Sequence, residues 1–274
     1  MTSRMNPMGL FHRASRAVPA SADGDGGIRL ALGHVGYVFP DGSVGLHDVT
    51  CAFAATSTAV IGLNGSGKST LLGVLDGSLT PLTGSVRVEV GDASLDFSRR
   101  RDRRRLSRLV VGVDAERLPP RLRRLRTVAQ VVRGALDAAG WPRGEREARC
   151  ADLLALCRLN MMADRPVDAL GGLQRHLLSI AVALAPSPRM LVADEPTRGL
   201  EGSDARQVRE VLLGSGPRVV FATHDLDIVS ASDPEVEEAL LLDEGRAVAQ
   251  GPVRQVLDAY DVLIRERRKA VRRS

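Results

Sequence analysis

The sequence of 274 residues contains almost no lysine: of its 38 basic residues, only Lys68 and Lys269 are lysine. Aromatic residues make up only 3%, which is too few for repeated stacking on bases and argues against a protein that binds single-stranded nucleic acid. No run approaches the roughly 20 consecutive apolar residues that a membrane-spanning helix needs. The composition therefore favours a soluble globular chain.

The three cysteines, Cys51, Cys150 and Cys157, are odd in number and lack the spacing of metal ligands. This excludes a disulfide framework and a zinc site, and it favours a reducing compartment. We expect all three to be small core residues. Residues 1–27 hold no apolar run long enough for a signal peptide, and their small, polar and helix-breaking residues predict a disordered leader.

The formal net charge of +5 is unevenly distributed. Residues 99–126 contain twelve arginines against three acidic residues, and residues 265–274 contain six basic residues against one. The remainder of the chain is therefore acidic, and the positive charge lies in two basic patches.

Short apolar runs bounded by glycine, proline and aspartate predict strands, and apolar residues at helical spacing predict helices. Strands are expected at residues 28–38, 46–53, 58–62, 85–90, 109–113, 190–193 and 218–222, with a hairpin over 240–250. Helices are expected from residue 66 to 75 and at 127–139, 145–159 and 173–185. This alternation predicts an α/β core with a helical insertion.

Residues 62–70 form a complete glycine-rich phosphate loop between a predicted strand and a predicted helix. Glycines let the backbone amides turn toward an anion, and the following helix N-terminus adds a favourable dipole. Lys68 can reach the β- and γ-phosphates, and Ser69 can offer its hydroxyl to Mg²⁺. The loop therefore predicts binding of a nucleoside triphosphate. Its residues are Gly62, Leu63, Asn64, Gly65, Ser66, Gly67, Lys68, Ser69 and Thr70.

Two carboxylates follow the apolar strand that begins at Met190. Asp194 at the strand end suits Mg²⁺ coordination, and Glu195 lies where it can polarise a water for attack on the γ-phosphate. His224 follows the next apolar strand and is the candidate for a γ-phosphate contact. With Lys68, these residues predict an ATP-hydrolysing site.

The order of these motifs, with Glu195-Pro-Thr and Thr223-His-Asp, resembles the nucleotide-binding subunit of ATP-binding cassette (ABC) transporters over residues 28–260. The resemblance implies a P-loop cassette with a mainly parallel core sheet, an N-terminal antiparallel β subdomain and an inserted helical subdomain at 117–185. Residues 261–274 would then be a basic C-terminal tail. It also implies ATP and Mg²⁺ as cofactors, with Phe39 stacking on adenine and Tyr37 as the second candidate. Core packing is the alternative for Phe39.

The family's signature motif, Leu-Ser-Gly-Gly-Gln, is degenerate in this chain, where Leu170, Gly171, Gly172, Leu173 and Gln174 occupy its place. In the family, two cassettes dimerise head to tail, and one chain's signature caps the ATP of the other. Gly171 removes a hydroxyl donor and Leu173 adds bulk near the phosphate. We expect a weakened contact between cassettes and intact ATP binding, so the isolated chain should hydrolyse ATP slowly.

Two further positions depart from the family pattern. Ala115 lies near the place of a glutamine that bridges Mg²⁺ and the membrane subunit, with Asp114 or Glu116 as open alternatives. Glu201 replaces an aspartate in the loop after the acidic strand. The elements that act between subunits are thus altered, while those that act within one chain are complete.

The motifs are most similar to the ATPases of energy-coupling-factor importers, nearest to the biotin and cobalt branches. This implies a peripheral ATPase on the cytoplasmic face of the membrane, bound to integral membrane subunits and paired with an identical or different cassette. The alternative is a weakly or non-hydrolysing cassette that acts as a structural or regulatory partner of a second ATPase. A soluble cassette acting on ribosomes or DNA is disfavoured, and no specific nucleic acid is expected as a partner.

The basic segment 99–126 lies beside the altered glutamine position, on the side that faces the membrane subunit in the family. Two interpretations of this segment stay open. It contacts acidic groups or anionic lipid, or it is a solvated insertion without a partner. The tail from residue 265 is expected to be a helix end or a juxtamembrane contact.

Overall fold

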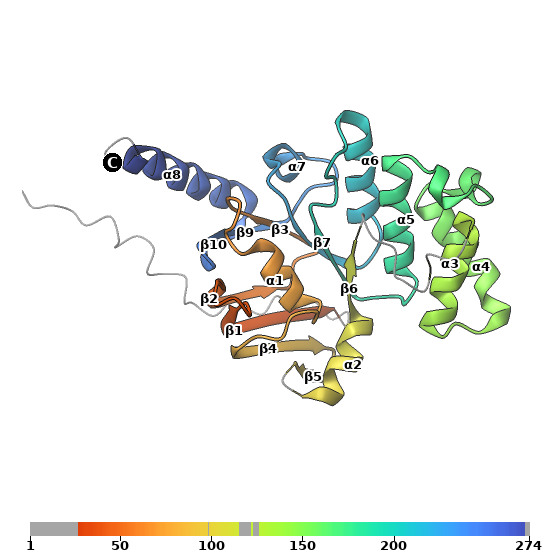
Figure 1. The fold of residues 1–274 in the computed structure, drawn as a ribbon, viewed down its shortest axis with the longest axis horizontal. Helices are drawn as coiled ribbons and strands as arrows, with labels where there is room; N and C mark the ends of the chain where they lie inside the picture. The colour runs from red at the N-terminus through yellow and green to blue at the C-terminus, as the bar shows by residue number, and fades with distance from the viewer. Residues whose placement is uncertain (1–26, 98, 115–121, 123–125, 272–274) are drawn as a thin grey trace, which may run out of the picture.

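The computed structural model describes residues 27–97, 99–114, 122 and 126–271. Two β-sheets are packed with helices in layers, and helix α1 (Lys68–Leu75) lies between the sheets (Figure 1). The predicted leader lies outside the described residues except for Gly27, and so does the predicted start of the helical subdomain at residue 117.

The first sheet has four strands in the order β2-β1-β4-β5, and all neighbouring strands are antiparallel. Residues along β1 alternate between buried and half-buried positions, as a sheet with one face on the core requires. This sheet confirms the antiparallel β subdomain that the resemblance implied. Its strands are β1 (Ile28–Val38), β2 (Val44–Phe53), β4 (Thr83–Val90) and β5 (Ala93–Asp96).

The second sheet has six strands in the order β10-β9-β3-β8-β7-β6. Its neighbours are parallel except β9 and β10, which form the predicted antiparallel hairpin. All five residues of β3 are buried, which is typical of a parallel strand covered on both faces. The strands are β3 (Ser57–Ile61), β6 (Val110–Val113), β7 (Met190–Asp194), β8 (Arg218–Ala222), β9 (Glu238–Asp243) and β10 (Arg246–Pro252).

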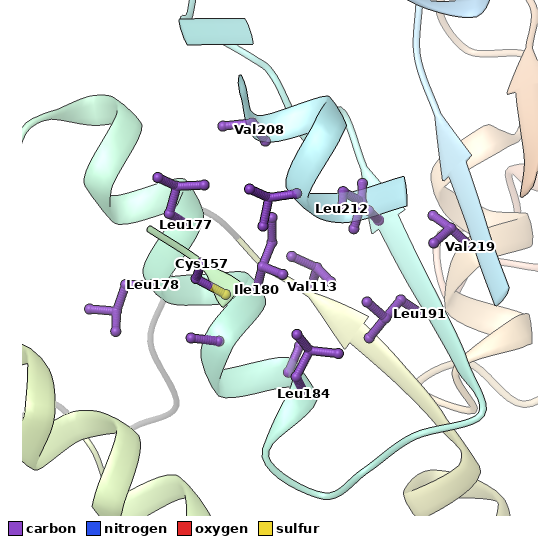
Figure 2. Packing of buried hydrophobic residues seen from close by; sticks show 14 of the residues in the cluster. Val113, Cys157, Leu177, Leu178, Ile180, Leu184, Leu191, Val208, Leu212 and Val219 are labelled. Atoms are coloured by element: carbon purple, nitrogen blue, oxygen red, sulfur yellow. The ribbon is translucent and has the colours of Figure 1, made fainter. Parts of the chain in front are cut away.

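Alternate residues of the parallel strands enter two different hydrophobic clusters. Val192, together with the residues of the neighbouring parallel strands that point to the same face, belongs to the cluster that also contains residues of α1 and of the antiparallel sheet. Leu191 and Val219 on the other face pack against the helical side, where Figure 2 shows them beside Leu184 and Leu212. The helices on this side are α3 (Val128–Ala139), α4 (Arg143–Leu156), α5 (Gly172–Leu184) and α6 (Gly202–Leu213), with short 3₁₀ turns at Asn160–Met162 and Val167–Ala169.

The cysteines are free and buried, as predicted. Burial raises the pKa of the Cys51 and Cys157 thiols to about 12.

Several elements escaped prediction from the sequence. The arginine run forms helix α2 (Arg100–Leu109), because Leu106 is buried and Leu109, three residues later, packs against the same cluster. The chain also contains β5, α6, α7 (Leu226–Ser230) and α8 (Val253–Val271). The expected boundary between residues 260 and 261 falls inside α8, which continues without a break. None of the helices in the described part of the chain is long and apolar enough to cross a membrane.

Candidate functional site

The phosphate loop, residues 62–70, runs from the end of β3 into α1, as predicted. Gly62, Gly65 and Gly67 have φ values of 149°, 78° and 101°, which disfavour any residue with a Cβ. Space is also restricted: a Cβ on Gly62 would lie 2.2 Å from the carbonyl oxygen of Leu242, and one on Gly67 would lie 2.6 Å from that of Gly45. The loop is therefore held closely between neighbouring backbone segments.

Lys68 is only 8% exposed. Its ammonium donates hydrogen bonds to the carbonyl oxygens of Gly62 (2.9 Å) and Leu63 (3.0 Å). Burial lowers the pKa of Lys68, while the negative charges of Glu195 and Asp194 act in the opposite direction. The cation is thus held at the loop within the field of both carboxylates.

Ser66 is buried inside the loop. Its backbone carbonyl accepts a hydrogen bond from Gly245 N–H (2.9 Å), whereas its hydroxyl has no hydrogen-bond partner among the described residues. A buried hydroxyl without a partner is costly. The hydroxyl of Ser66 is a hydrogen-bond donor, and such a donor suits a loop that binds an anion with oxygen acceptors.

Asp194 is the last residue of β7, and Glu195 follows it at a left-handed φ of 47°. The Glu195 N–H donates to the carbonyl of Ala222, the last residue of β8 (2.9 Å). His224 lies two residues later, with Nδ1 2.8 Å from Oε1 of Glu195. Because β7 and β8 are parallel neighbours, their carboxyl ends bring the acidic pair and the histidine to the same edge of the sheet.

A cleft of about 1090 Å³ collects most of the predicted residues on one surface. Phe39 is 36% exposed at this cleft and packs edge-on against Tyr37, with ring centroids 5.0 Å apart, so it is not a core residue. The predicted residues that line the cleft are Phe39, Asn64, Gly65, Gly67, Lys68, Ser69, Thr70, Asp194, Glu195 and His224.

Other residues of the cleft were not singled out from the sequence. Asp76 is half-buried at the end of α1, and burial raises the pKa of its carboxyl group. It lies opposite Gly112 of β6, where a Cβ would be 2.8 Å from its Oδ2. His176 and Arg198 also line the cleft. No local sequence signal marks either group: His176 follows the polar residues Gln174 and Arg175 in the first turns of α5, and nothing local distinguishes Asp76 from a surface acid.

Asp114 lines the cleft, whereas Ala115 and Glu116 lie outside the described residues. Among the described residues, Asp114 is thus the acidic group at the altered glutamine position that reaches the site.

The signature residues, Leu170, Gly171, Gly172, Leu173 and Gln174, are not among those that line the cleft of their own chain. Gly171 precedes the first residue of α5 and provides no side-chain cap. Leu173 is half-buried and packs against the large helical cluster. Part of the bulk that we expected at the phosphate is therefore covered by the chain's own core.

The oxygen donors of the cleft fit Mg²⁺. No three histidine, cysteine or acidic side chains gather into a metal cage in the described ranges. Ser69 and Asp194 instead line the cleft together with Lys68. Mg²⁺ is commonly bound by one or two protein oxygens together with substrate phosphates, so this donor set suits it.

Comparison with known proteins also indicates a cassette that binds ATP. The family model described as "ABC transporter" matches residues 46–198. A putative ABC transporter ATP-binding protein of Methanopyrus kandleri is 34% identical over 233 residues, which cover 83% of this chain and 82% of the relative. The cobalt import ATP-binding protein CbiO of Rhodobacter capsulatus is 34% identical over 83% of this chain and 80% of its own length. A methionine import ATP-binding protein, MetN of Bradyrhizobium diazoefficiens, is 32% identical over 90% of this chain and 66% of its own length.

Solved structures share the fold. CbiO1 from Clostridium perfringens, described as part of the ABC transporter complex CbiONQ, has a TM-score of 0.71 at 25% identity and covers 86% of this chain and 93% of that one. The dimeric ABC transporter cassette MJ0796 has a TM-score of 0.67 at 22% identity, with 82% and 98% covered. The site geometry, the family model and the relatives agree: the chain belongs to the ABC transporter family, as an ATPase cassette.

Proposed function

We propose that this chain is the hydrolysing ATPase of an energy-coupling-factor importer for a vitamin or a metal such as cobalt. The observation that carries the proposal is the convergence of Lys68, Asp194, Glu195 and His224 on one cleft, with the last two in contact. The similarity to cobalt import proteins supports the importer type. Methionine importers are similar to a comparable degree, and they are the competing assignment.

The residues divide the work as follows. Phe39 stacks on adenine at the mouth of the cleft, and the amides of the phosphate loop with Lys68 bind the phosphates. Ser69 and Asp194 would hold Mg²⁺, which would supply positive charge to neutralise the phosphates of ATP. Glu195 orients and deprotonates the attacking water, since its carboxylate lines the cleft and is held by His224. His224 holds that carboxylate in place through Nδ1, and it donates to the γ-phosphate through Nε2 when both ring nitrogens carry a proton.

The signature acts between two cassettes. The MJ0796 cassette is dimeric, and we propose a head-to-tail dimer for this chain, with the same chain or with another cassette. Gly171 has no hydroxyl to offer a partner's γ-phosphate. Leu173, however, packs partly against its own core, which leaves the amides at the start of α5 less obstructed than the sequence suggested. We therefore expect a weakened but functional contact, and slow hydrolysis without partners.

A second candidate function rests on the positions where this chain departs from the family's motifs. With Gly171, Leu173 and no glutamine at residue 115, the chain could serve as a regulatory cassette beside a second ATPase. ATPase assays of the complex with Glu195→Gln separate the two functions. If this chain hydrolyses ATP, the variant loses about 100-fold or more of the activity from its own site. Unchanged activity in the complex would support the regulatory function and contradict the first.

The importer type is tested by purifying the tagged full chain from solubilised membranes. Recovery of energy-coupling-factor subunits supports the proposal. Recovery of a methionine permease, or of no polytopic subunit, contradicts it.

A further inference from the structure

The β9–β10 turn, residues 243–245, packs against the backbone of the phosphate loop. Gly245 N–H donates to the carbonyl of Ser66 (2.9 Å), and the Gly245 carbonyl accepts from His47 N–H of β2 (2.7 Å). A Cβ on Gly67 would lie 3.3 Å from the Gly245 Cα, and the carbonyl oxygen of Leu242 abuts Gly62. The turn therefore forms the wall against which the phosphate loop rests.

The turn itself adopts a conformation that needs support. Glu244 has a φ of 47° and Gly245 a φ of 72°, so two consecutive residues are left-handed. A left-handed conformation costs free energy for a residue with a side chain such as Glu244. Any contact that holds the Glu244 side chain in place therefore also holds the position of Gly245.

Helix α8 provides this contact through Arg267. Its Nη2 donates to both oxygens of Asp243 (2.8 and 3.0 Å) and to Oε1 of Glu244 (2.9 Å). The Asp243 side chain is only 16% exposed, so this charge pair is partly shielded from water. One guanidinium nitrogen thus joins both acidic residues of the turn.

Arg267 stands at the end of a packed helix face. Val256 is buried, and Tyr260 and Leu263 are half-buried against the helical cluster. Their spacing of three and four residues puts them on the same face of α8 as Arg267. The helix is therefore anchored to the core before it reaches the turn, as its course beside β9 and β10 in Figure 1 shows.

We propose that Arg267 is a positioning residue for ATP binding: it fixes the Asp243–Glu244 turn, and the turn fixes the phosphate loop through Gly245 and Ser66. The basic C-terminal helix thereby gains a role in nucleotide affinity. The proposal rests on the phosphate loop as the ATP site. Because the hydrogen bonds of Gly245 run to Ser66 of the phosphate loop and to His47, we expect Arg267 to act on affinity and not on the chemical step.

The test measures the Kd of MgATP by calorimetry, the KM and kcat of hydrolysis, and the melting temperature without nucleotide, all on the full chain. Arg267→Ala is expected to raise Kd and KM about two- to fivefold, the range of a partly exposed ion pair, with kcat unchanged. Arg268→Ala, at the next and exposed position, is the matched control and should leave all values unchanged. Raising the ionic strength should reduce the difference in the Kd of MgATP between wild type and Arg267→Ala, because salt screens the ion pair.

Two further variants separate positioning from simple loss of structure. Arg267→Lys should keep wild-type affinity, because only one nitrogen makes the contacts and an ammonium can replace it. Arg267→Glu should bind MgATP more weakly than Arg267→Ala, and the second change Glu244→Arg should recover part of the loss. Unchanged Kd in both Arg267→Ala and Arg267→Glu would overturn the inference while ATP binding by the wild type stands. Absence of MgATP binding by the wild type would contradict the proposed function itself.

Discussion

The imidazole Nδ1 of His224 and the carboxylate Oε1 of Glu195 lie 2.8 Å apart, although the two residues are separated by 29 positions in the chain. The Glu195 side chain is 20% exposed and that of His224 is 67% exposed, so the pair lies at the cleft surface, open to a substrate. The carboxylate accepts the hydrogen bond, which orients it within the cleft.

His224→Ala should lower kcat at least about tenfold and raise the Kd of MgATP by a smaller factor, because the histidine orients the general base and makes only one of the proposed contacts to the γ-phosphate. Stopped-flow or coupled-enzyme ATPase assays with parallel binding titrations measure both quantities. His34→Ala is the control, since His34 is exposed and hydrogen-bonded to Asp48 on the antiparallel sheet. Equal kcat for His224→Ala and wild type would remove His224 from the proposed machinery.

Lys68→Arg should weaken MgATP binding at least about tenfold, even though arginine replaces lysine almost everywhere else in this chain. The buried ammonium fits between two loop carbonyls, and a planar guanidinium is larger and needs a different geometry. Lys269→Arg, at the only other lysine, should bind like wild type. Calorimetric titration compares the two, and equal affinity in Lys68→Arg would show that positive charge alone suffices.

Asp76→Asn should raise the melting temperature at pH 7. Burial raises the pKa of the Asp76 carboxyl group in the folded chain, so the ionised form is disfavoured there relative to the unfolded chain. The wild type therefore loses stability as pH rises through that folded pKa, and asparagine avoids this loss. The gain should shrink as the pH is lowered toward about 3, below the pKa of an unfolded aspartate, where the carboxyl group is mostly protonated in both states. A pH-independent difference in thermal melts would contradict burial as the cause.

Arg209→Met should destabilise the fold by about 3 kcal/mol. Arg209 is 4% exposed, and its guanidinium donates to the carbonyls of Ile228 (2.9 Å), Ala231 (2.9 Å) and Asp233 (2.8 Å), and also to that of Pro234. Methionine fills similar space but leaves these acceptors without their donor. Urea denaturation measures the loss, and the exposed Arg206→Met should change the unfolding midpoint little. A midpoint equal to that of wild type would mean that water replaces the guanidinium.

Residues 62–70 could be predicted in detail because their function depends on local spacing. Glycines at left-handed φ, a lysine and a hydroxyl at fixed intervals define a phosphate loop whatever surrounds it. The parallel strands were equally readable, since burial on both faces demands continuous apolar runs such as 58–61. Asp194, Glu195 and His224 followed from their places after such strands.

The arginine run shows where local pattern fails. Ten residues with few apolar positions predict no helix, yet α2 forms because Leu106 and Leu109 reach the cluster beneath the antiparallel sheet. Asp76 and His176 join the cleft for the same kind of reason, since the ends of separate helices meet there. The expectation for Leu173 was incomplete because its partial burial depends on neighbouring helices.

The sequence by itself determined the nucleotide chemistry, because phosphate binding and hydrolysis use residue types at short, fixed spacings. Only the tertiary structure decided what supports that chemistry: the β9–β10 turn behind the phosphate loop, and Arg267 of α8 behind the turn. Gly245 is hydrogen-bonded to Ser66 although the two residues are far apart in the sequence, and such long-range contacts depend on the packing of whole sheets and helices.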